Sequence, residues 1–209
     1  MGTTRGRPPS ADSAETEQRI LRAARARFAR HGFRATTNRL IADDVGITPG
    51  AIYHYVDSKA ALYAAVYCET IDQVYTEFER AAADHAALLE RFTAVMRRAC
   101  ELQALDPSIP GFIVAVAQET QRHPDLLALM APQRGRHASF FSGLVGDAVA
   151  NGELAPDTDQ RAVADLLGAI MTGVARIAHA AGDSERYVAA VDVLDQLFTG
   201  SLVVGGSPA

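Results

Sequence analysis

The chain has 209 residues, enough for one large domain or two modest ones, and 48% of them are hydrophobic. Its net charge of −5 would by itself argue against nucleic-acid binding. No apolar stretch is long enough to span a bilayer and the N-terminus lacks the apolar segment of a signal peptide, so we expect a cytoplasmic chain without a membrane partner.

The charge is unevenly distributed along the chain. Residues 1–60 contain ten Lys and Arg against six Asp and Glu, a net of +4, whereas residues 61–209 contain ten against nineteen, a net of −9. A basic first part on an acidic remainder is typical of a protein that brings one end to DNA. Chance clustering of arginines on solvated faces would give the same asymmetry. The choice between this explanation and DNA binding therefore depends on sequence motifs.

Residues 1–11 form the first segment, which is rich in Gly, Pro and Arg and is expected to be disordered on its own. Within it, Arg5-Gly6-Arg7-Pro8 is similar to the core of an AT-hook, whose arginines enter a narrow A·T minor groove. Arg5 and Arg7 are therefore candidate DNA contacts. A flexible solubilising tail would explain the same composition.

The second segment, 12–57, is predicted to hold three helices. The first ends at Gly32, and the second begins at Thr37 as its cap and ends in a turn at Gly46, which permits the positive φ of a tight connection. Thr48 caps the third helix, and a proline follows at the first helical position, where a missing N–H costs nothing. Two short helices joined in this way predict a helix-turn-helix.

The order and spacing of residues in this segment resemble the TetR family of bacterial transcriptional regulators over roughly residues 15–66. The residues that carry the resemblance are Gly32-Phe33, Thr36-Thr37, Ile41-Ala42, Val45-Gly46-Ile47-Thr48, Gly50, Ile52-Tyr53-His54-Tyr55-Val56, Ser58-Lys59 and Leu62. Two positions depart from the family pattern, because Asn38 replaces an aliphatic residue and Val56 replaces a phenylalanine. The resemblance implies a DNA-reading head on a divergent helical ligand domain, and a dimer.

The third helix is expected to enter the major groove with its N-terminal residues against base edges. Its small first residues allow a close approach, and Thr48 offers a hydroxyl and a methyl group for readout. The resemblance implies that Tyr53 faces DNA, and Lys59, the only lysine, starts a helix where a phosphate is favoured. Pro49 and Gly50 also fit plain helix-start geometry, and His54 also fits a solvated position. The candidate DNA contacts are Arg5, Arg7, Thr36, Thr37, Thr48, Pro49, Gly50, Ala51, Tyr53, His54 and Lys59.

The third segment, 58–205, shows no convincing strand, so the whole chain is predicted to be all-α with about nine or ten helices. Pro107 and Pro110 are expected to break the chain before a helix that starts at Phe112. The helices expected in this segment are 60–82, 85–105, 112–122, 125–130, 135–151, 157–181 and 184–199.

A ligand cavity is expected among the helices of this third segment, with Gln118 and Glu119 as polar anchors in an otherwise apolar lining. Ordinary core packing explains the aromatic and Met positions equally well. The candidate ligand-binding residues are Tyr67, Ile71, Tyr75, Phe92, Met96, Cys100, Phe112, Val116, Gln118, Glu119, Phe140 and Met171.

The helices 135–151 and 157–181 are apolar on more than one face, which predicts burial on two sides. One side would face the core and the other a second subunit, in a four-helix interface that the family resemblance also implies. Interior helices of a monomer are the alternative. The candidate interface residues are Phe141, Leu144, Val145, Leu167, Ile170, Val174 and Ile177.

No catalytic or metal-ligating arrangement is evident, so neither an enzyme nor a cofactor is expected, and Cys68 and Cys100 are interpreted as reduced thiols. The favoured hypothesis is a dimeric repressor that binds a pseudo-palindromic operator and is released by a small, largely apolar effector. An activator or a regulator that answers a protein partner would carry the same head. A helical ligand carrier or enzyme without DNA binding is a further alternative.

Overall fold

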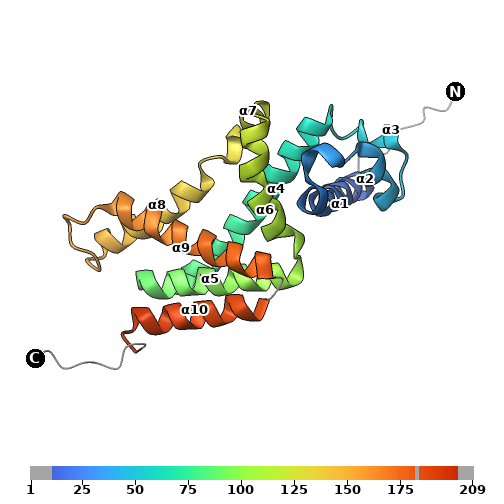
Figure 1. Ribbon diagram of the computed structural model, residues 1–209. Helices are drawn as coiled ribbons and strands as arrows, with labels where there is room; N and C mark the ends of the chain where they lie inside the picture. The colour runs from blue at the N-terminus through green and yellow to red at the C-terminus, as the bar shows by residue number, and fades with distance from the viewer. Residues whose placement is uncertain (1–10, 182–183, 202–209) are drawn as a thin grey trace, which may run out of the picture.

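The computed structural model describes residues 11–181 and 184–201, and within these ranges the chain is helical without any strand (Figure 1). The expectation of an all-α fold is therefore confirmed. The N-terminal helices, here called the head, are α1 (Ala11–Ala35), α2 (Asn38–Val45) and α3 (Pro49–Ile52). The remaining helices, here called the body, are α4 (Lys59–Ala83), α5 (Leu88–Leu105), α6 (Ser108–Arg122), α7 (Asp125–Leu129), the 3-10 turn η1 (Ala131–Gln133), α8 (Arg136–Ala150), α9 (Gln160–Ala181) and α10 (Ser184–Phe198).

The long helix α4 joins the head to the body, and its N-terminal half is part of the core of the head (Figure 1). That core also includes Phe112 of α6, whose ring centroid lies 5.1 Å from that of Tyr63. Leu126 and Met130, at the level of α7, complete it. The head therefore rests on three body elements. A second apolar cluster lies among α4, α5, α8, α9 and α10 and forms the core of the body.

Four predicted helix boundaries are wrong. Helix α5 begins at Leu88 and not at residue 85. Helix α9 begins at Gln160 and not at residue 157, and at this start the side chain of Asp159 accepts the N–H of Ala162 at 3.0 Å.

Helix α6 begins at Ser108, and Pro110 lies inside its first turn. A proline is tolerated there because the first amides of a helix have no intrahelical acceptor to lose. Helix α1 breaks at Gly32, as expected, but one more helical turn follows the break and ends at Ala35. Gly32 has φ 75° and ψ 175°, a conformation that only glycine adopts readily.

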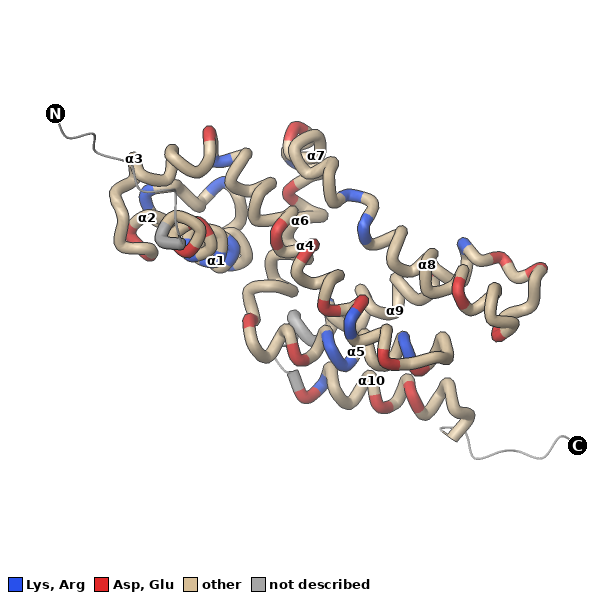
Figure 2. The backbone as a smooth tube through the Cα atoms, turned by 180° about the vertical axis from the view of Figure 1, so that it is seen from behind, with Lys and Arg blue, Asp and Glu red and all other residues tan. Residues whose placement is uncertain are grey.

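Basic residues gather around α1, while acidic residues recur along the body helices (Figure 2). The charge asymmetry along the sequence therefore also appears in the folded chain, between α1 and the body helices. Among the described residues, no helix is long and apolar enough to cross a membrane.

Candidate DNA-binding surface and ligand cavity

The helix-turn-helix is held by local bonds that the sequence anticipates. The backbone N–H of Leu40 donates to the side chain of Thr37 at 3.3 Å, which caps α2. Gly46 ends α2 with φ 76°, and its N–H donates to the carbonyl of Ala42 at 2.9 Å. Ile41 and Ile52 are fully buried between α2 and α3, so they fix the angle at which the second helix leaves the first.

Helix α3 presents small, exposed residues at its start. Thr48 has the extended backbone of a cap, but its side chain makes no capping hydrogen bond, which differs from the expected role. Pro49 and Gly50 are exposed beside it, and Ala51 is half-buried. The hydroxyl of Thr48 is therefore free of the helix end, and the backbone of this turn is accessible to a large partner.

Turns follow α3, and within them Tyr53 and Tyr55 have different surroundings. Tyr53 is 57% exposed and His54 is exposed next to it. Tyr55 is half-buried and packs against the core of the head, as expected for a residue that does not share a face with Tyr53. The outward surface of the head thus contains Thr48, Tyr53 and His54.

Thr36 cannot serve as a phosphate contact, although it is a candidate from sequence. Its exposed fraction is 0%, and its hydroxyl donates to the carbonyl of Gly32 at 2.9 Å. The reason is the break at Gly32, because the Thr36 hydroxyl satisfies the carbonyl of that residue and is buried in doing so. Thr37 remains exposed. Arg5 and Arg7 lie outside the described residues.

The ammonium group of Lys59 is occupied by the end of α1. Its Nζ donates to the carbonyls of Phe33 at 2.9 Å and Thr36 at 3.1 Å, with Arg34 at 3.4 Å, and it lies 4.5 Å from the centroid of the Phe33 ring. Burial, with the nearby charge of Arg34, lowers the pKa of this amine. An ammonium has three donors, and all three point at carbonyls. Lys59 therefore ties the start of α4 to the end of α1.

Glu119 of α6 also contacts the end of α1. Its carboxylate accepts the N–H of Phe33 at 3.2 Å, and a Cβ added to Gly32 would lie 2.8 Å from Glu119 Oε1. The carboxylate is buried at this contact. Glu119, a candidate ligand anchor from sequence, thus satisfies an amide that the break in α1 leaves unpaired and does not face the cavity.

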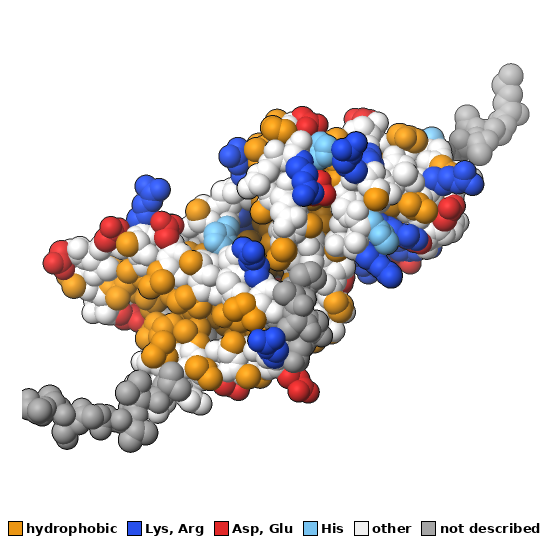
Figure 3. All heavy atoms as spheres, viewed as in Figure 1, with side chains coloured by type: hydrophobic (Ala, Val, Ile, Leu, Met, Phe, Trp, Pro, Cys, Tyr) orange, Lys and Arg blue, Asp and Glu red, His pale blue; other side chains and the backbone are white. Residues whose placement is uncertain are grey.

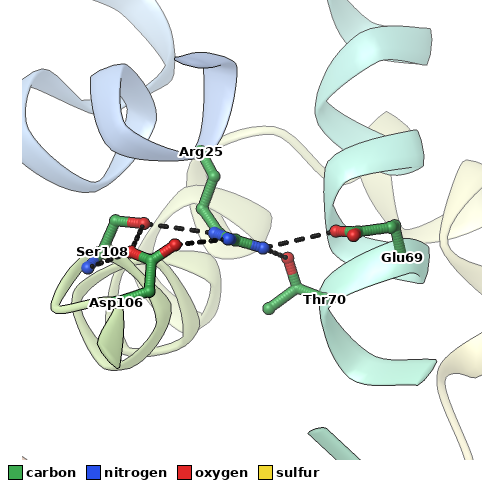
Figure 4. A network of polar contacts seen from close by, with 5 residues as sticks. All are labelled: Arg25, Glu69, Thr70, Asp106 and Ser108. Carbon is green, nitrogen blue, oxygen red and sulfur yellow. Dashed lines mark hydrogen bonds and ion pairs between the residues drawn. The ribbon is translucent and has the colours of Figure 1, made fainter. Parts of the chain in front are cut away.

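Arg25 of α1 joins the head to two separate parts of the body (Figure 4). Its guanidinium is 2% exposed. It donates to Asp106 at 2.6 Å and to Ser108 at 3.1 Å, where α5 passes into α6. It also donates to Glu69 and Thr70 of α4, each at 3.3 Å.

The bonds of Arg25 differ in strength between its two sides. Burial raises the pKa of Asp106, but hydrogen bonds from Ser108 and Arg25 together hold it below its usual value. Burial raises the pKa of Glu69, and the opposing attraction of Arg25 is smaller. The shorter bond, 2.6 Å to Asp106 against 3.3 Å to Glu69, indicates that the α5–α6 junction holds Arg25 more firmly than α4 does.

A cavity of about 370 Å³ lies in the body between α4, α5, α6, α8, α9 and α10. Its wall residues stand directly next to the partners of Arg25: Ile71 follows Thr70, and Ile109 follows Ser108. The partners of Arg25 and part of the cavity lining thus belong to the same turns of α4 and α6.

The structure brings part of the predicted ligand set to this cavity. Those that line it are Tyr67, Ile71, Tyr75, Val116 and Met171. Phe92 and Met96 are fully buried in the core of the body, where Cys100 and Phe140 also pack, and Phe112 belongs to the core of the head. Gln118 is exposed and does not line the cavity. Gln103, His137, Thr172 and Tyr187 line the cavity and were missed, because a single polar residue in a helical pattern does not reveal which way it faces.

Two polar features stand out in the lining. The hydroxyl of Tyr75 and Nδ1 of His137 are hydrogen-bonded at 2.6 Å, and desolvation lowers the pKa of His137. The ring of His137 fits because Gly168 has no side chain, since a Cβ there would lie 2.7 Å from Nε2. Gln103 is 9% exposed, and its amide makes no hydrogen bond to any described residue.

Most of the predicted interface residues are buried within the monomer instead. Phe141, Leu144, Val145 and Leu167 form part of the body's own core, while Ile170 and Val174 are half-buried against it. Apolar side chains nevertheless gather on the surface of the last two helices (Figure 3). The large exposed ones are Leu166 and Ile177 on α9 and Val188, Val193 and Leu197 on α10. Only Ile177 of the predicted set is on this surface.

The fold and the exposed helix-turn-helix define a helical DNA-binding regulator. Residues 20–66 match the family model described as bacterial regulatory proteins, tetR family, and residues 88–194 match the one described as tetracyclin repressor-like, C-terminal domain. The chain belongs to the TetR family, and the resemblance noted in the sequence is confirmed.

Similar proteins of known name are regulators. The transcriptional regulator UidR of Escherichia coli strain K12 is 26% identical over 166 residues, which cover 78% of this chain and 81% of that one. The solved structure of Salmonella enterica GusR has a TM-score of 0.73 at 27% identity and covers 93% of this chain and 98% of that one. FadR of Bacillus subtilis, solved with stearoyl-CoA, has a TM-score of 0.76 at 18% identity over 89% of this chain and 99% of that one, and shares the fold.

Proposed function

We propose that the chain is a ligand-responsive repressor that binds a pseudo-palindromic operator as a homodimer and leaves it when a small molecule fills the cavity. The observation that carries this proposal is the outward surface of the head. Thr48, Pro49 and Gly50 are exposed and small, and Tyr53 stands beside them with its ring in solvent. Such a surface lets a helix start approach base edges while a hydroxyl bonds a phosphate.

Thr37, Ala51 and His54 complete the proposed DNA surface. Lys59 acts instead as a positioning residue, since its three donors are used by carbonyls of α1. It holds the start of α4 against the head, so a movement of α4 reaches the DNA-binding helices.

The proposed dimer uses the exposed apolar surface of α9 and α10. Leu166 is 59% exposed there, with Ile177 on the same helix and three further apolar residues on α10. Figure 3 shows apolar side chains gathered on this surface, and a large exposed apolar patch often marks a protein–protein interface. Pairing it about a two-fold axis gives a four-helix interface and sets two heads at a fixed separation. The operator then needs two half-sites one or more helical turns apart.

Release follows from the connection between the cavity and the head. Arg25 bonds residues next to the lining residues Ile71 and Ile109, so a ligand that prefers a different distance between α4 and α6 also prefers a different position of the head. The effect is limited by that preference, and couplings of this kind are typically about 1–3 kcal/mol.

The test uses a duplex selected from a random pool by the purified chain, with binding followed by fluorescence anisotropy. Tyr53→Phe removes the proposed phosphate bond and should weaken binding by about tenfold to a hundredfold, since a hydrogen bond to a charged group contributes about 1.5–3 kcal/mol. Tyr55→Phe, whose ring packs inward, is the matched control and should bind as the wild type does. Selection of no duplex, or equal losses in the two variants, contradicts the proposal.

A further inference from the structure

The walls of the cavity contain no Asp, Glu, Lys or Arg among the described residues that line it. Aliphatic and aromatic side chains from six helices make up most of the surface. Arg136, on the helix that carries His137, is paired with Glu79 at 2.9 Å and does not reach the lining. An ionised group moved from water into such a space loses its hydration without gaining a counter-ion, which is strongly unfavourable.

The polar groups of the cavity are neutral, and those of Tyr67, Gln103 and Thr172 have no hydrogen-bond partner among the described residues. Tyr75 and His137 satisfy each other through their 2.6 Å hydrogen bond. Gln103 of α5 is the most deeply buried of the three residues without a partner, since only 9% of its surface is exposed while Tyr67 is half-buried and Thr172 is exposed. An amide both donates and accepts, so it can bond a hydroxyl or a carbonyl equally well.

We propose that the cavity binds a neutral molecule with an apolar body and a single hydroxyl or ketone group, and that the Gln103 amide is the hydrogen-bonding partner of that group. Carboxylates bind less well, because no Lys or Arg among the described residues lines the wall. The volume of about 370 Å³ lies at the lower end of the range of about 300–1,000 Å³ that holds drug-sized ligands, so the molecule is small. This inference names the ligand class of the proposed regulator and rests on that function.

A matched set of ten-carbon probes tests the class directly. Decan-1-ol, decan-2-one and sodium decanoate are titrated into the full chain by isothermal calorimetry at pH 8, where decanoate is ionised. The alcohol or the ketone should bind with a Kd at least about thirtyfold lower than that of decanoate, because only decanoate must bury a charge. Decanoate binding as tightly as the neutral probes, or no binding of either neutral probe, would overturn the proposal.

Substitution of the anchor tests the residue. Gln103→Leu keeps a side chain of similar size and should raise the Kd of the better neutral probe about threefold to tenfold, the usual effect of one hydrogen bond. Gln118→Leu is the control, since this exposed glutamine of α6 lies outside the cavity. Circular dichroism confirms that both variants fold. The same Kd for the two variants would remove Gln103 from the site.

The titrations contain no DNA, so the two proposals fail separately. A chain that binds decan-1-ol but selects no duplex keeps its ligand class and loses its function as a repressor. A chain that selects a duplex but prefers decanoate keeps the function and loses the ligand class.

Discussion

Replacing Arg25 with glutamine removes the only described side chain that bonds the head to both α4 and the α5–α6 junction. The wild-type guanidinium is 2% exposed and makes its shortest bond, 2.6 Å, to Asp106. Glutamine is shorter and uncharged, so it cannot reach both sides. Asp106 and Glu69 then lose the cation that faces them.

The size of the effect follows from how deeply those two carboxylates are buried. Removing one partner of a fully buried ion pair costs about 3–5 kcal/mol, because a charge is left without compensation. Here the side chains of Asp106 and Glu69 remain 34% and 24% exposed, so water replaces part of the lost interaction. We therefore expect Arg25→Gln to lower the free energy of unfolding by about 2–3 kcal/mol.

Urea unfolding followed by circular dichroism at 222 nm measures this loss. Arg98→Gln is the matched control, because Arg98 bonds Glu77 and Glu101 at 2.6 Å but joins only α4 and α5 within the body. Arg98 is closer to the surface, and its loss should cost about 1 kcal/mol or less. Equal losses in the two variants, or a loss below about 1 kcal/mol for Arg25→Gln, would refute the role assigned to Arg25.

Four further predictions follow from single sites. Gly32→Ala should destabilise the chain by about 1–3 kcal/mol in urea, since the residue has positive φ and its new Cβ would meet Glu119; an unchanged midpoint would contradict this. Lys59→Ala should weaken DNA binding without changing its dependence on salt, whereas a slope flattened by about one unit would show a phosphate contact instead. Leu166→Arg should give a folded monomer in sedimentation velocity, and a persisting dimer would exclude the α9–α10 surface. Asp106→Asn should cost stability at pH 7 and progressively less as the pH falls below about 4, because a depressed carboxyl pKa stabilises the fold only above its unfolded value; a pH-independent difference would contradict it.

The head was predictable from sequence because the roles of its residues are set by near neighbours. Thr37 caps the helix that starts next to it, and Gly46 supplies a positive φ within one turn. The break at Gly32 was also visible. The bond from Phe33 to Glu119 was not, because it depends on α6, which is distant in sequence.

The body was predictable only as a set of helices. Leu166 and Leu167 are adjacent in a helix that is apolar on more than one face, and only the packed structure tells that Leu167 enters the core while Leu166 faces solvent. The direction in which a helical residue faces is equally hidden in the sequence for the two glutamines. Gln118 was therefore predicted to line the cavity and Gln103 was not, whereas the structure shows the opposite. Arg25 carries no sequence signal either, because its partners lie 44 to 83 positions away in the chain.

Footprinting of the purified chain on the DNA upstream of its own gene tests most directly whether the head reads duplex DNA. We expect protection of two half-sites related by a two-fold axis, with centres about 10 base pairs or a multiple of that apart. Protection should fade as the salt concentration rises, as phosphate contacts require. No protection at low salt with an unliganded chain would contradict the assignment of Thr48 and Tyr53 to a DNA surface.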